Sequence, residues 1–391
     1  MLTQGINFIN FKKKFNKKNI HNKILNLIKR KSDLISSLSK NYKDSYKKKL
    51  LNKFKNNNNF RVIGMGGSIL GTQAIYNYLY NKTKKNFLFV NNLQNIKKKI
   101  SKKKVVNLIV SKSGTTIETI VNSNVLIKKK DKNIFITENK KSYIYLLAEK
   151  LKADIVHHNN FIGGRYSVLS EVGMLPAELM GLKSKNFRQF NSIIKNKKFL
   201  NALILNVDSI LYFIKNKKYN SIIINYDETA EDFFKWYQQL VAESLGKKNK
   251  GILPIVSNMP KDNHSLMQLY LDGFKNNFFT FFYTHENKSK IFNKSNLLLF
   301  ENNIKGKNIN DIIFAQKKAT ENIFNNKKLP FRSFEIKQRD EKTLGELFCF
   351  FILETILLGQ ALNLNPYNQP AVELIKKETN KILIKGYKYY F

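Results

Sequence analysis

The sequence predicts an α/β protein with two parallel-sheet units that are joined and flanked by helices. In residues 60–156 short β-type runs alternate with helical segments, which is the pattern of βαβ units. Residues 221–362 show a similar alternation, without a clear sequence repeat between the two halves. Two strand ends of the first unit carry clusters of glycine and hydroxyl residues, and open parallel sheets bind ligands where their strands end.

The expected elements are placed as follows in chain order. Residues 1–54 are expected to form a lysine-rich, amphipathic helical segment, because Ile20, Ile24 and Leu27 recur on one helical face. The first unit, 55–184, is expected to have strands at 61–63, 87–90, 105–110, 133–137 and 154–156. A helical connection over 184–215 opens the second unit, 185–368, with strands at 221–225, 277–283, 295–300 and 331–336 and helices at 230–245, 311–324 and 343–362. Residues 369–391 are expected to form a C-terminal helix.

Composition limits the class of protein. The 391 residues are 42% hydrophobic, which is enough for two domains with real cores. A net charge of +41 would by itself favour a binder of nucleic acid or membrane surfaces. The lysines are dispersed in short runs among Asn, Ile and Phe, which all have A/T-rich codons. Base composition therefore accounts for the excess, and neither nucleic acid nor a membrane is expected as a partner.

The compartment is expected to be the cytoplasm. The single cysteine, Cys349, lies in an apolar helical run, so no disulfide framework or metal site is expected. The first 18 residues are interrupted by lysines and lack the apolar core of a signal peptide. The longest apolar stretch, 344–364, contains Glu346, Glu354 and Gln360, which favours a buried helix over a membrane span.

The strongest local feature is residues 110–119, where an apolar strand ends in a hydroxyl-rich turn before a helix. Four hydroxyls lie within six residues, on Ser111, Ser113, Thr115 and Thr116. Gly114 permits an unusual backbone angle, and the helix start supplies free N–H groups and the positive end of its dipole. The turn is suited to a phosphate monoester, although a hydroxyl-rich N-cap that only starts a helix has the same composition.

A second stretch, 61–71, has the same order of strand, small-residue turn and helix. It contains glycines at 64, 66, 67 and 71 and a hydroxyl at Ser68. The spacing differs from the dinucleotide fingerprint, and the next strand ends in Asn91 and Asn92 without an acidic ribose partner. A sugar phosphate held between two strand ends is therefore expected in preference to a dinucleotide.

Further residues have side chains suited to acid–base chemistry. Arg165 follows paired glycines, and a guanidinium fixed at such a turn is suited to stabilise negative charge that develops on a substrate. A glycine turn that carries an ordinary surface arginine has the same sequence pattern. Gln239 and Glu243 are four apart on one helical face, as a surface pair would also be. His264 follows a loop and opens a helix, a position that a structural histidine also takes. Gln369 precedes a proline-started helix that carries Lys376, one lysine among many.

Six ordered segments in residues 55–380 resemble the phosphoglucose isomerase family, which is built on two sugar-isomerase (SIS) domains. The segments are GMGGSILG, SKSGTTIET, GGRYSVLS, QQLVAESLGK, NHSLMQL and NPYNQPAVELIKK. The resemblance implies two flavodoxin-like αβα sandwich domains with helical N- and C-terminal extensions. It also implies reversible conversion of glucose 6-phosphate to fructose 6-phosphate, a step of glycolysis and gluconeogenesis, without metal or organic cofactor.

The resemblance also implies roles for single residues. The catalytic base falls on Glu243, the arginine that stabilises the enediolate on Arg165, and the ring-opening pair on His264 and Lys376. In this family the histidine comes from the neighbouring subunit, so a homodimer with shared active sites is implied. The substrate-binding and phosphate-binding residues fall on Gly67, Ser68, Ser111, Lys112, Ser113, Thr115, Thr116, Gln239 and Gln369.

Some positions depart from the family pattern. Ala371 and Ile375 replace glycines near Lys376, and Ser113 replaces a more usual threonine while keeping its hydroxyl. The length suggests a short bacterial form of the family. Two alternatives stay open from the sequence: a dual phosphoglucose/phosphomannose isomerase, and a non-catalytic SIS module that senses a phosphosugar.

Overall fold

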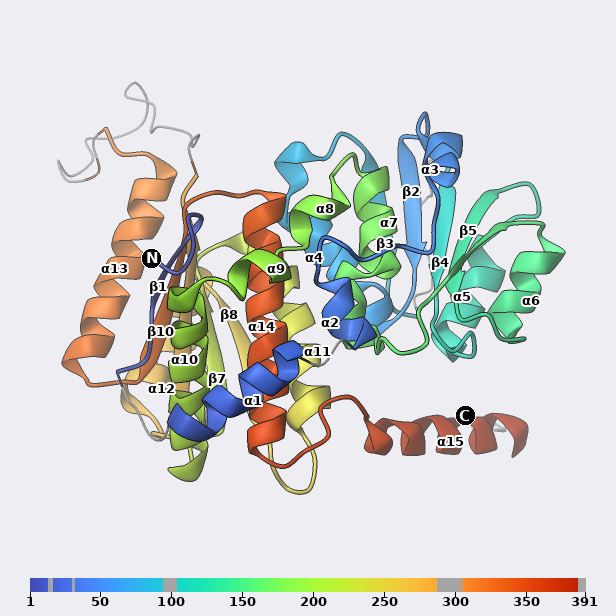
Figure 1. The fold of residues 1–391 in the computed structure, drawn as a ribbon. Coiled ribbons are helices and arrows are strands. Elements are labelled where there is room, and N and C mark those ends of the chain that lie inside the picture. Colours follow the sequence, from blue (N-terminus) through green and yellow to red (C-terminus); the bar gives the residue numbers. More distant parts are fainter. Residues whose placement is uncertain (13–16, 30–31, 94–103, 287–303, 305, 386–391) are drawn as a thin grey trace, which may run out of the picture.

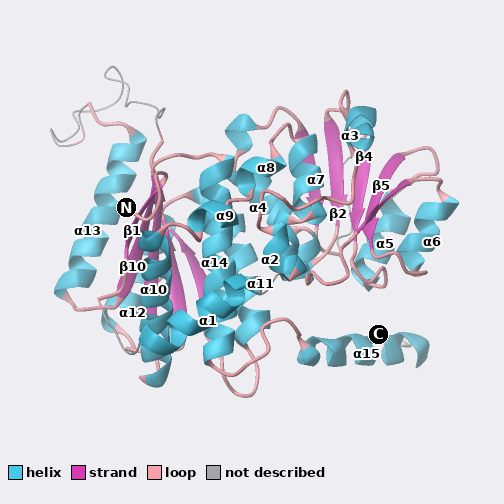
Figure 2. Ribbon diagram, in the orientation of Figure 1, coloured by secondary structure: helices cyan, strands magenta, loops and turns pink. Residues whose placement is uncertain are grey.

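The computed structural model describes residues 1–12, 17–29, 32–93, 104–286, 304 and 306–385. Two five-stranded sheets lie in two lobes, with helices flanking the strands of each (Figures 1 and 2). The strands are β1 (Ile6–Ile9), β2 (Asn59–Ile63), β3 (Asn86–Val90), β4 (Val106–Val110), β5 (Lys132–Thr137), β6 (Asp154–His157), β7 (Asn220–Asn225), β8 (Leu253–Asn258), β9 (Asn277–Thr284) and β10 (Phe331–Ile336). The predicted strand at 295–300 lies outside the described residues.

The helices of the described residues connect these strands and cover the sheets. They are α1 (Lys17–Lys29), α2 (Asp33–Ser37), α3 (Lys48–Phe54), α4 (Leu70–Tyr78), α5 (Ile117–Leu126), α6 (Tyr143–Lys150), α7 (Glu171–Leu179), α8 (Ser184–Phe187), α9 (Phe190–Ile193), α10 (Lys197–Lys215), α11 (Glu231–Leu245), α12 (Met267–Asp272), α13 (Ile309–Asn326), α14 (Glu341–Ala361) and α15 (Pro370–Lys385). The predicted helices of the second unit correspond to α11, α13 and α14, and the helical connection to α8, α9 and α10.

The first sheet is wholly parallel, in the order β3-β2-β4-β5-β6. Alternate strand residues face opposite sides: Ile63, Ile109 and Phe135 pack in a small core with α5 and α6, whereas Val62 and Leu108 join the main core. β3, the next strand along the chain, pairs with one side of β2, and the following strand, β4, pairs with the other side. The strand order therefore reverses direction between β2 and β4, and parallel sheets bind ligands at such a point.

The second sheet repeats this order as β8-β7-β9-β10, with β1 as its fifth strand. The predicted α/β class with two parallel-sheet domains is confirmed. The expectation that residues 1–54 are only helical was wrong, because β1 pairs antiparallel with β10, with Ile6 opposite Ile336. Ile6 is fully buried and the ring of Phe8 packs against that of Phe334 with centroids 4.5 Å apart, so apolar packing draws the N-terminal strand into the sheet.

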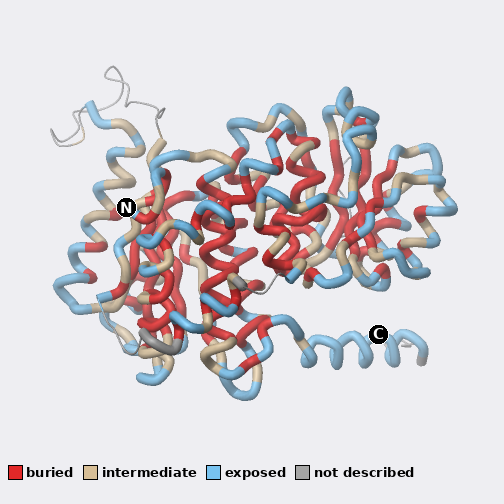
Figure 3. Tube along the Cα trace, viewed as in Figure 1, coloured by how far each residue is buried: buried red, intermediate tan, exposed pale blue. Residues whose placement is uncertain are grey.

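The apolar helix predicted at 343–362 is α14, which lies inside the second lobe (Figure 3). In the described part of the chain it is the one helix long and apolar enough to cross a membrane, but 89% of its apolar window is buried in the fold. Its two buried acidic residues have partners there. Glu354 forms a buried ion pair with Arg332, and Glu346 accepts a hydrogen bond from Thr3 Oγ1 at 2.6 Å. Cys349 is buried in the same helix, and burial raises its thiol pKa to about 12.

The two lobes meet along α11, which packs against α4 of the first lobe. Arg339 strengthens this contact: it pairs with Asp227 at 2.9 Å and Glu286 at 2.5 Å, and it donates to the carbonyl of Tyr78 at 3.2 Å. The C-terminal end of α11 lies beside the 3₁₀ turn Gly66–Ser68, which follows β2. The polar residues of both lobes are thus brought together at the carboxyl edge of the first sheet.

Candidate active site

The two predicted turns lie side by side, because β2 and β4 are paired neighbours with Ile63 opposite Ile109. A Cβ atom at Gly64 would lie 3.0 Å from the carbonyl oxygen of Val110 and 3.2 Å from Cβ of Ser68. The hydroxyl-rich turn after β4 and the glycine turn after β2 therefore face one space at the point where the sheet order reverses.

The turn after β4 is internally bonded. Ser111 Oγ accepts from the Gly114 amide at 3.2 Å and contacts Thr116 Oγ1 at 3.3 Å. Ser113 Oγ accepts from the Thr115 amide at 3.3 Å and from its hydroxyl at 3.0 Å. Gly114 has φ +65°, and a Cβ there would meet Ser142 Oγ at 1.9 Å, so glycine is required. Thr116 is the N-cap of α5, so the hydroxyls surround a ten-residue helix's N-terminus.

Lys112 reaches from the hydroxyl turn to the loop before Gly163. Its Nζ donates to the carbonyl of Asn160 at 2.7 Å and lies 3.6 Å from Glu138 Oε1. The predicted phosphate-binding lysine is thus held between two parts of the first lobe. Its side chain links the hydroxyl turn to the loop that leads to Arg165.

The glycines of the turn after β2 allow it to pack closely against α11 and against the loop that carries Arg165. Gly66 has φ +52°, and a Cβ there would lie 2.6 Å from Nε2 of Gln239. A Cβ at Gly67 would lie 2.2 Å from the carbonyl carbon of Gly164. Because only glycine fits these contacts, the turn next to Ser68 lies directly against Gln239 and against the backbone that carries Arg165.

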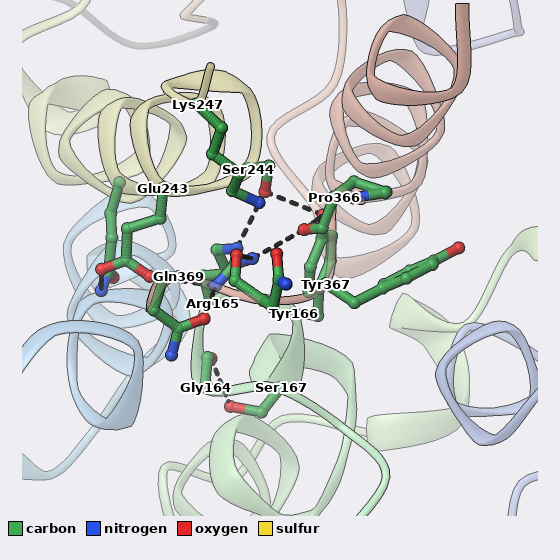
Figure 4. A network of polar contacts seen from close by, with 12 residues as sticks. Gly164, Arg165, Tyr166, Ser167, Glu243, Ser244, Lys247, Pro366, Tyr367 and Gln369 are labelled. Atoms are coloured by element: carbon green, nitrogen blue, oxygen red, sulfur yellow. Dashed lines mark hydrogen bonds and ion pairs between the residues drawn. The ribbon is translucent and has the colours of Figure 1, made fainter. Parts of the chain in front are cut away.

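Arg165 is 2% exposed, and all five of its N–H groups have a partner (Figure 4). Its Nη1 donates to Glu243 Oε2 at 3.1 Å and to Gln369 Oε1 at 2.7 Å. Its Nε donates to Ser244 Oγ at 2.8 Å. Its Nη2 donates to the backbone carbonyls of Pro366 at 2.6 Å and Asn368 at 3.2 Å. Residues far apart in sequence therefore meet on one guanidinium.

Glu243 is the carboxylate of this group, and both its oxygens accept a hydrogen bond. Oε1 accepts from Gln239 Nε2 at 2.8 Å, and Oε2 accepts from Arg165. Its side chain is 26% exposed, whereas that of Arg165 is 1% exposed. A cavity of about 800 Å³ opens beside Glu243 and is lined also by Lys247, Asn365, Gln369 and Val372. The carboxylate is therefore oriented and still reachable by a small ligand.

His264 of the same chain is not brought to Glu243. Glu243 lies near the C-terminal end of α11, which leads into β8 and so lies at the amino edge of the second sheet. His264 follows the carboxyl end of β8, a strand of six residues that spans about 20 Å. The two side chains therefore lie at opposite edges of the second sheet.

Lys376 is not among the hydrogen-bond partners of Arg165. It lies on α15, about 9 Å of helix beyond its first residue, and its exposed Nζ pairs with Glu373 at 2.6 Å. Figure 1 shows α15 extending away from the second lobe, below the first lobe in this view, and Figure 3 shows it exposed over its length. The exposed α15 residues include Leu374 at 67% and Ile375 at 71%.

Two sequence comparisons decide the family. The family model described as phosphoglucose isomerase matches residues 24–387. A glucose-6-phosphate isomerase from Methanocaldococcus jannaschii is 35% identical over 353 residues, covering 84% of this chain and 85% of that protein. The chain belongs to the phosphoglucose isomerase family.

Solved structures agree with the fold of this phosphoglucose isomerase family member. A hypothetical protein from Thermus thermophilus has a TM-score of 0.80 at 20% identity and covers 93% of this chain and 94% of its own. A glucose-6-phosphate isomerase from Chlamydia trachomatis has a TM-score of 0.72 at 18% identity and covers 91% of this chain and 79% of its own. At these identities the likeness supports the two-domain α/β fold.

Three residues of the site were missed in the sequence. Ser244 and Tyr166 are fully buried and contact Arg165 or its partners, and Lys247 Nζ donates to the carbonyl of Asn365 at 2.5 Å. Burial lowers the pKa of Lys247 to about 8, and the charge of Arg165 acts in the same direction. Each lies within four residues of an expected site residue, and that proximity was the one signal available. In the described part of the chain, no group of three or more His, Cys, Asp and Glu side chains could hold a metal ion.

Proposed function

We propose that this member of the phosphoglucose isomerase family interconverts glucose 6-phosphate and fructose 6-phosphate, as an aldose–ketose isomerase of glycolysis and gluconeogenesis. The observation that carries the proposal is the 3.1 Å contact between Glu243 and Arg165 beside the hydroxyl-lined turn. A carboxylate that moves a proton and a cation that stabilises the resulting charge are the two groups this isomerisation needs.

The proton transfer follows from this pair. Glu243 removes the proton from C2 of the open-chain aldose, and the electron pair forms a cis-enediolate whose charge develops on oxygen. Arg165 stabilises that oxygen, the C1 oxygen. Glu243 then returns its proton to C1 while the C2 hydroxyl proton passes to the C1 oxygen, which gives the C2 ketone and a C1 hydroxyl. Since every N–H of Arg165 is bonded, a substrate oxygen replaces Glu243 or Gln369, the two side chains that accept from Nη1.

The phosphate is held by the hydroxyls of Ser68, Ser111, Ser113 and Thr116 at the N-terminus of α5. A phosphate of charge about −1.5 to −2 suits this group of donors and the helix dipole. Gly67 and Thr115 shape the two turns, and Lys112 links the hydroxyl turn to the neighbouring loop. Gln239 binds Glu243 and contacts Gly66, so it is placed to orient the sugar between phosphate and base.

Ring opening uses His264 and Lys376, and the protein acts as a homodimer. Within one chain His264 and Glu243 lie at opposite edges of the second sheet, so His264 of the partner subunit is the one that serves this site. The exposed apolar side chains of α15 fit a helix that is covered by the partner subunit in the complete dimer.

The two SIS domains span residues 55–184 and 185–368, and β1 completes the sheet of the second domain. The helix over residues 369–391 carries Lys376. The enzyme works in the cytoplasm.

The proposed reaction is tested by incubating the purified protein with fructose 6-phosphate and measuring glucose 6-phosphate. We expect steady turnover without added metal or cofactor, in both directions. Mannose 6-phosphate is assayed beside it, and turnover of both sugars would identify a dual-specificity isomerase. A protein that binds fructose 6-phosphate without converting it would overturn the proposal in favour of a phosphosugar sensor.

The shared active site is tested by mixing two inactive variants, Glu243→Gln and His264→Asn, after dissociation and reassociation. In a mixed dimer one site has both wild-type groups, so a random mixture should recover about one quarter of wild-type activity. Each variant reassociated alone is the control and should stay inactive. Absence of recovery, with mixed dimers demonstrated by differential tagging, would mean that His264 does not act across subunits.

A further inference from the structure

A closed ring of four hydrogen bonds lies on the side of Arg165 away from Glu243 (Figure 4). Arg165 Nε donates to Ser244 Oγ at 2.8 Å, and Ser244 Oγ lies 2.8 Å from the Tyr166 hydroxyl. The Tyr166 hydroxyl donates to the Pro366 carbonyl at 3.0 Å, and Arg165 Nη2 donates to the same carbonyl at 2.6 Å. Ser244 and Tyr166 are both fully buried.

The protons of this ring can be placed in only one way. Arg165 has donors alone and the Pro366 carbonyl has only lone pairs, so both ends of the chain are determined. The Tyr166 hydroxyl donates its proton to the Pro366 carbonyl, so the Ser244 hydroxyl must donate to the Tyr166 oxygen. Ser244 Oγ in turn accepts from Arg165 Nε. Reversing either hydroxyl would leave a buried contact with no proton in it.

The ring determines which edge of the guanidinium is presented to substrate. Nε and Nη2 face the ring and the backbone of the loop after Leu364, so Nη1 is left for Glu243 and Gln369. Trp236 Nε1 also donates to the Arg165 carbonyl at 3.1 Å, which fixes the main chain of the same residue from α11. The arginine therefore has little freedom to rotate or withdraw.

We propose that Tyr166 and Ser244 are positioning residues, which hold Arg165 Nη1 where the enediolate oxygen forms and couple it to the loop that carries Gln369. This inference rests on the proposed isomerase function. Burial raises the pKa of Tyr166 to about 12, although the charge of Arg165 acts the other way, so Tyr166 keeps its proton at neutral pH. A preorganised donor stabilises developing charge without reorganisation during the reaction, so the ring should matter for turnover more than for substrate binding.

Tyr166→Phe is the test. It removes the hydroxyl that accepts the Ser244 proton and donates to the Pro366 carbonyl, and so opens the ring. We expect kcat to fall about tenfold while KM for fructose 6-phosphate changes less than about twofold, since Arg165 acts on charge present in the transition state. The matched control is Tyr237→Phe on α11, whose fully buried hydroxyl donates to Glu354 Oε1 at 3.2 Å, away from Arg165. It should change the melting temperature comparably and leave kcat unchanged.

A double-mutant cycle distinguishes positioning from general weakening of the fold. In an Arg165→Lys background Tyr166→Phe should have no further effect on kcat, because the group it positions is gone. A wild-type kcat for Tyr166→Phe, an equal loss in Tyr237→Phe, or the same loss in the Arg165→Lys background would each overturn the inference. If Tyr166→Phe does not fold, Ser244→Ala is assayed by the same criteria. A wild-type protein without turnover would instead overturn the proposed function itself.

Discussion

Glu243→Gln is expected to lower kcat for fructose 6-phosphate by about 10³-fold, in the range seen when a general base is removed. The amide has nearly the same shape as the carboxylate but cannot take a proton from carbon. Its oxygen can still accept from Arg165 Nη1, so folding and phosphosugar binding should be nearly unchanged. The measurement is steady-state kinetics in both directions, together with binding of fructose 6-phosphate by calorimetry.

The matched control for Glu243→Gln is Glu231→Gln, which neutralises a carboxylate on the same helix. Glu231 lies in the first turn of α11 and pairs with Lys235 at 2.7 Å on the protein surface. Surface pairs of this kind contribute less than about 1 kcal/mol, so turnover should match the wild type. Retention of more than about a tenth of wild-type kcat by Glu243→Gln would assign the base to another residue.

Arg165→Lys is expected to lower kcat by about 10²-fold or more, as when a preorganised group that stabilises developing charge is removed. An ammonium has three donors from one point, whereas the guanidinium holds Ser244, Glu243 and the Pro366 carbonyl at once in a planar fork. The net positive charge is kept, so a loss of activity would report geometry and not charge alone. Kinetics and the melting temperature are measured on the same preparation.

The control for this variant is Arg188→Lys, at another buried arginine. Arg188 is 1% exposed, binds Asp44 through two contacts at 2.8 and 2.5 Å, and donates to the Leu169 carbonyl at 3.1 Å. Loss of that fork should lower the melting temperature without a matching fall in kcat. Equal kcat losses in the two variants would show that Arg165 acts through stability and does not contact the reacting atoms.

Much of the fold could be predicted from the local pattern. The strands β2 and β4 were expected because apolar runs of strand length end in glycine and hydroxyl turns, and α11 and α14 because apolar residues recur over helical length. Strands β1 and β8 were missed. β1 has only four residues among polar neighbours, and β8 contains Pro254, which weakens the strand pattern. Pairing with distant strands stabilises both, and a single-sequence pattern does not contain that information.

Residue types and spacing by themselves determined which groups were available for chemistry: the hydroxyls after β4, the glycines after β2, and the Gln239 and Glu243 pair four apart on one helical face. These follow from backbone geometry within a few residues, which a sequence records directly. Only the tertiary structure decided that Arg165 has all five donors engaged, that Ser244 and Tyr166 hold it from behind, and that His264 and Glu243 lie at opposite edges of the second sheet. Those relations join residues up to 204 apart in sequence, as for Arg165 and Gln369, and they arise from packing two lobes together.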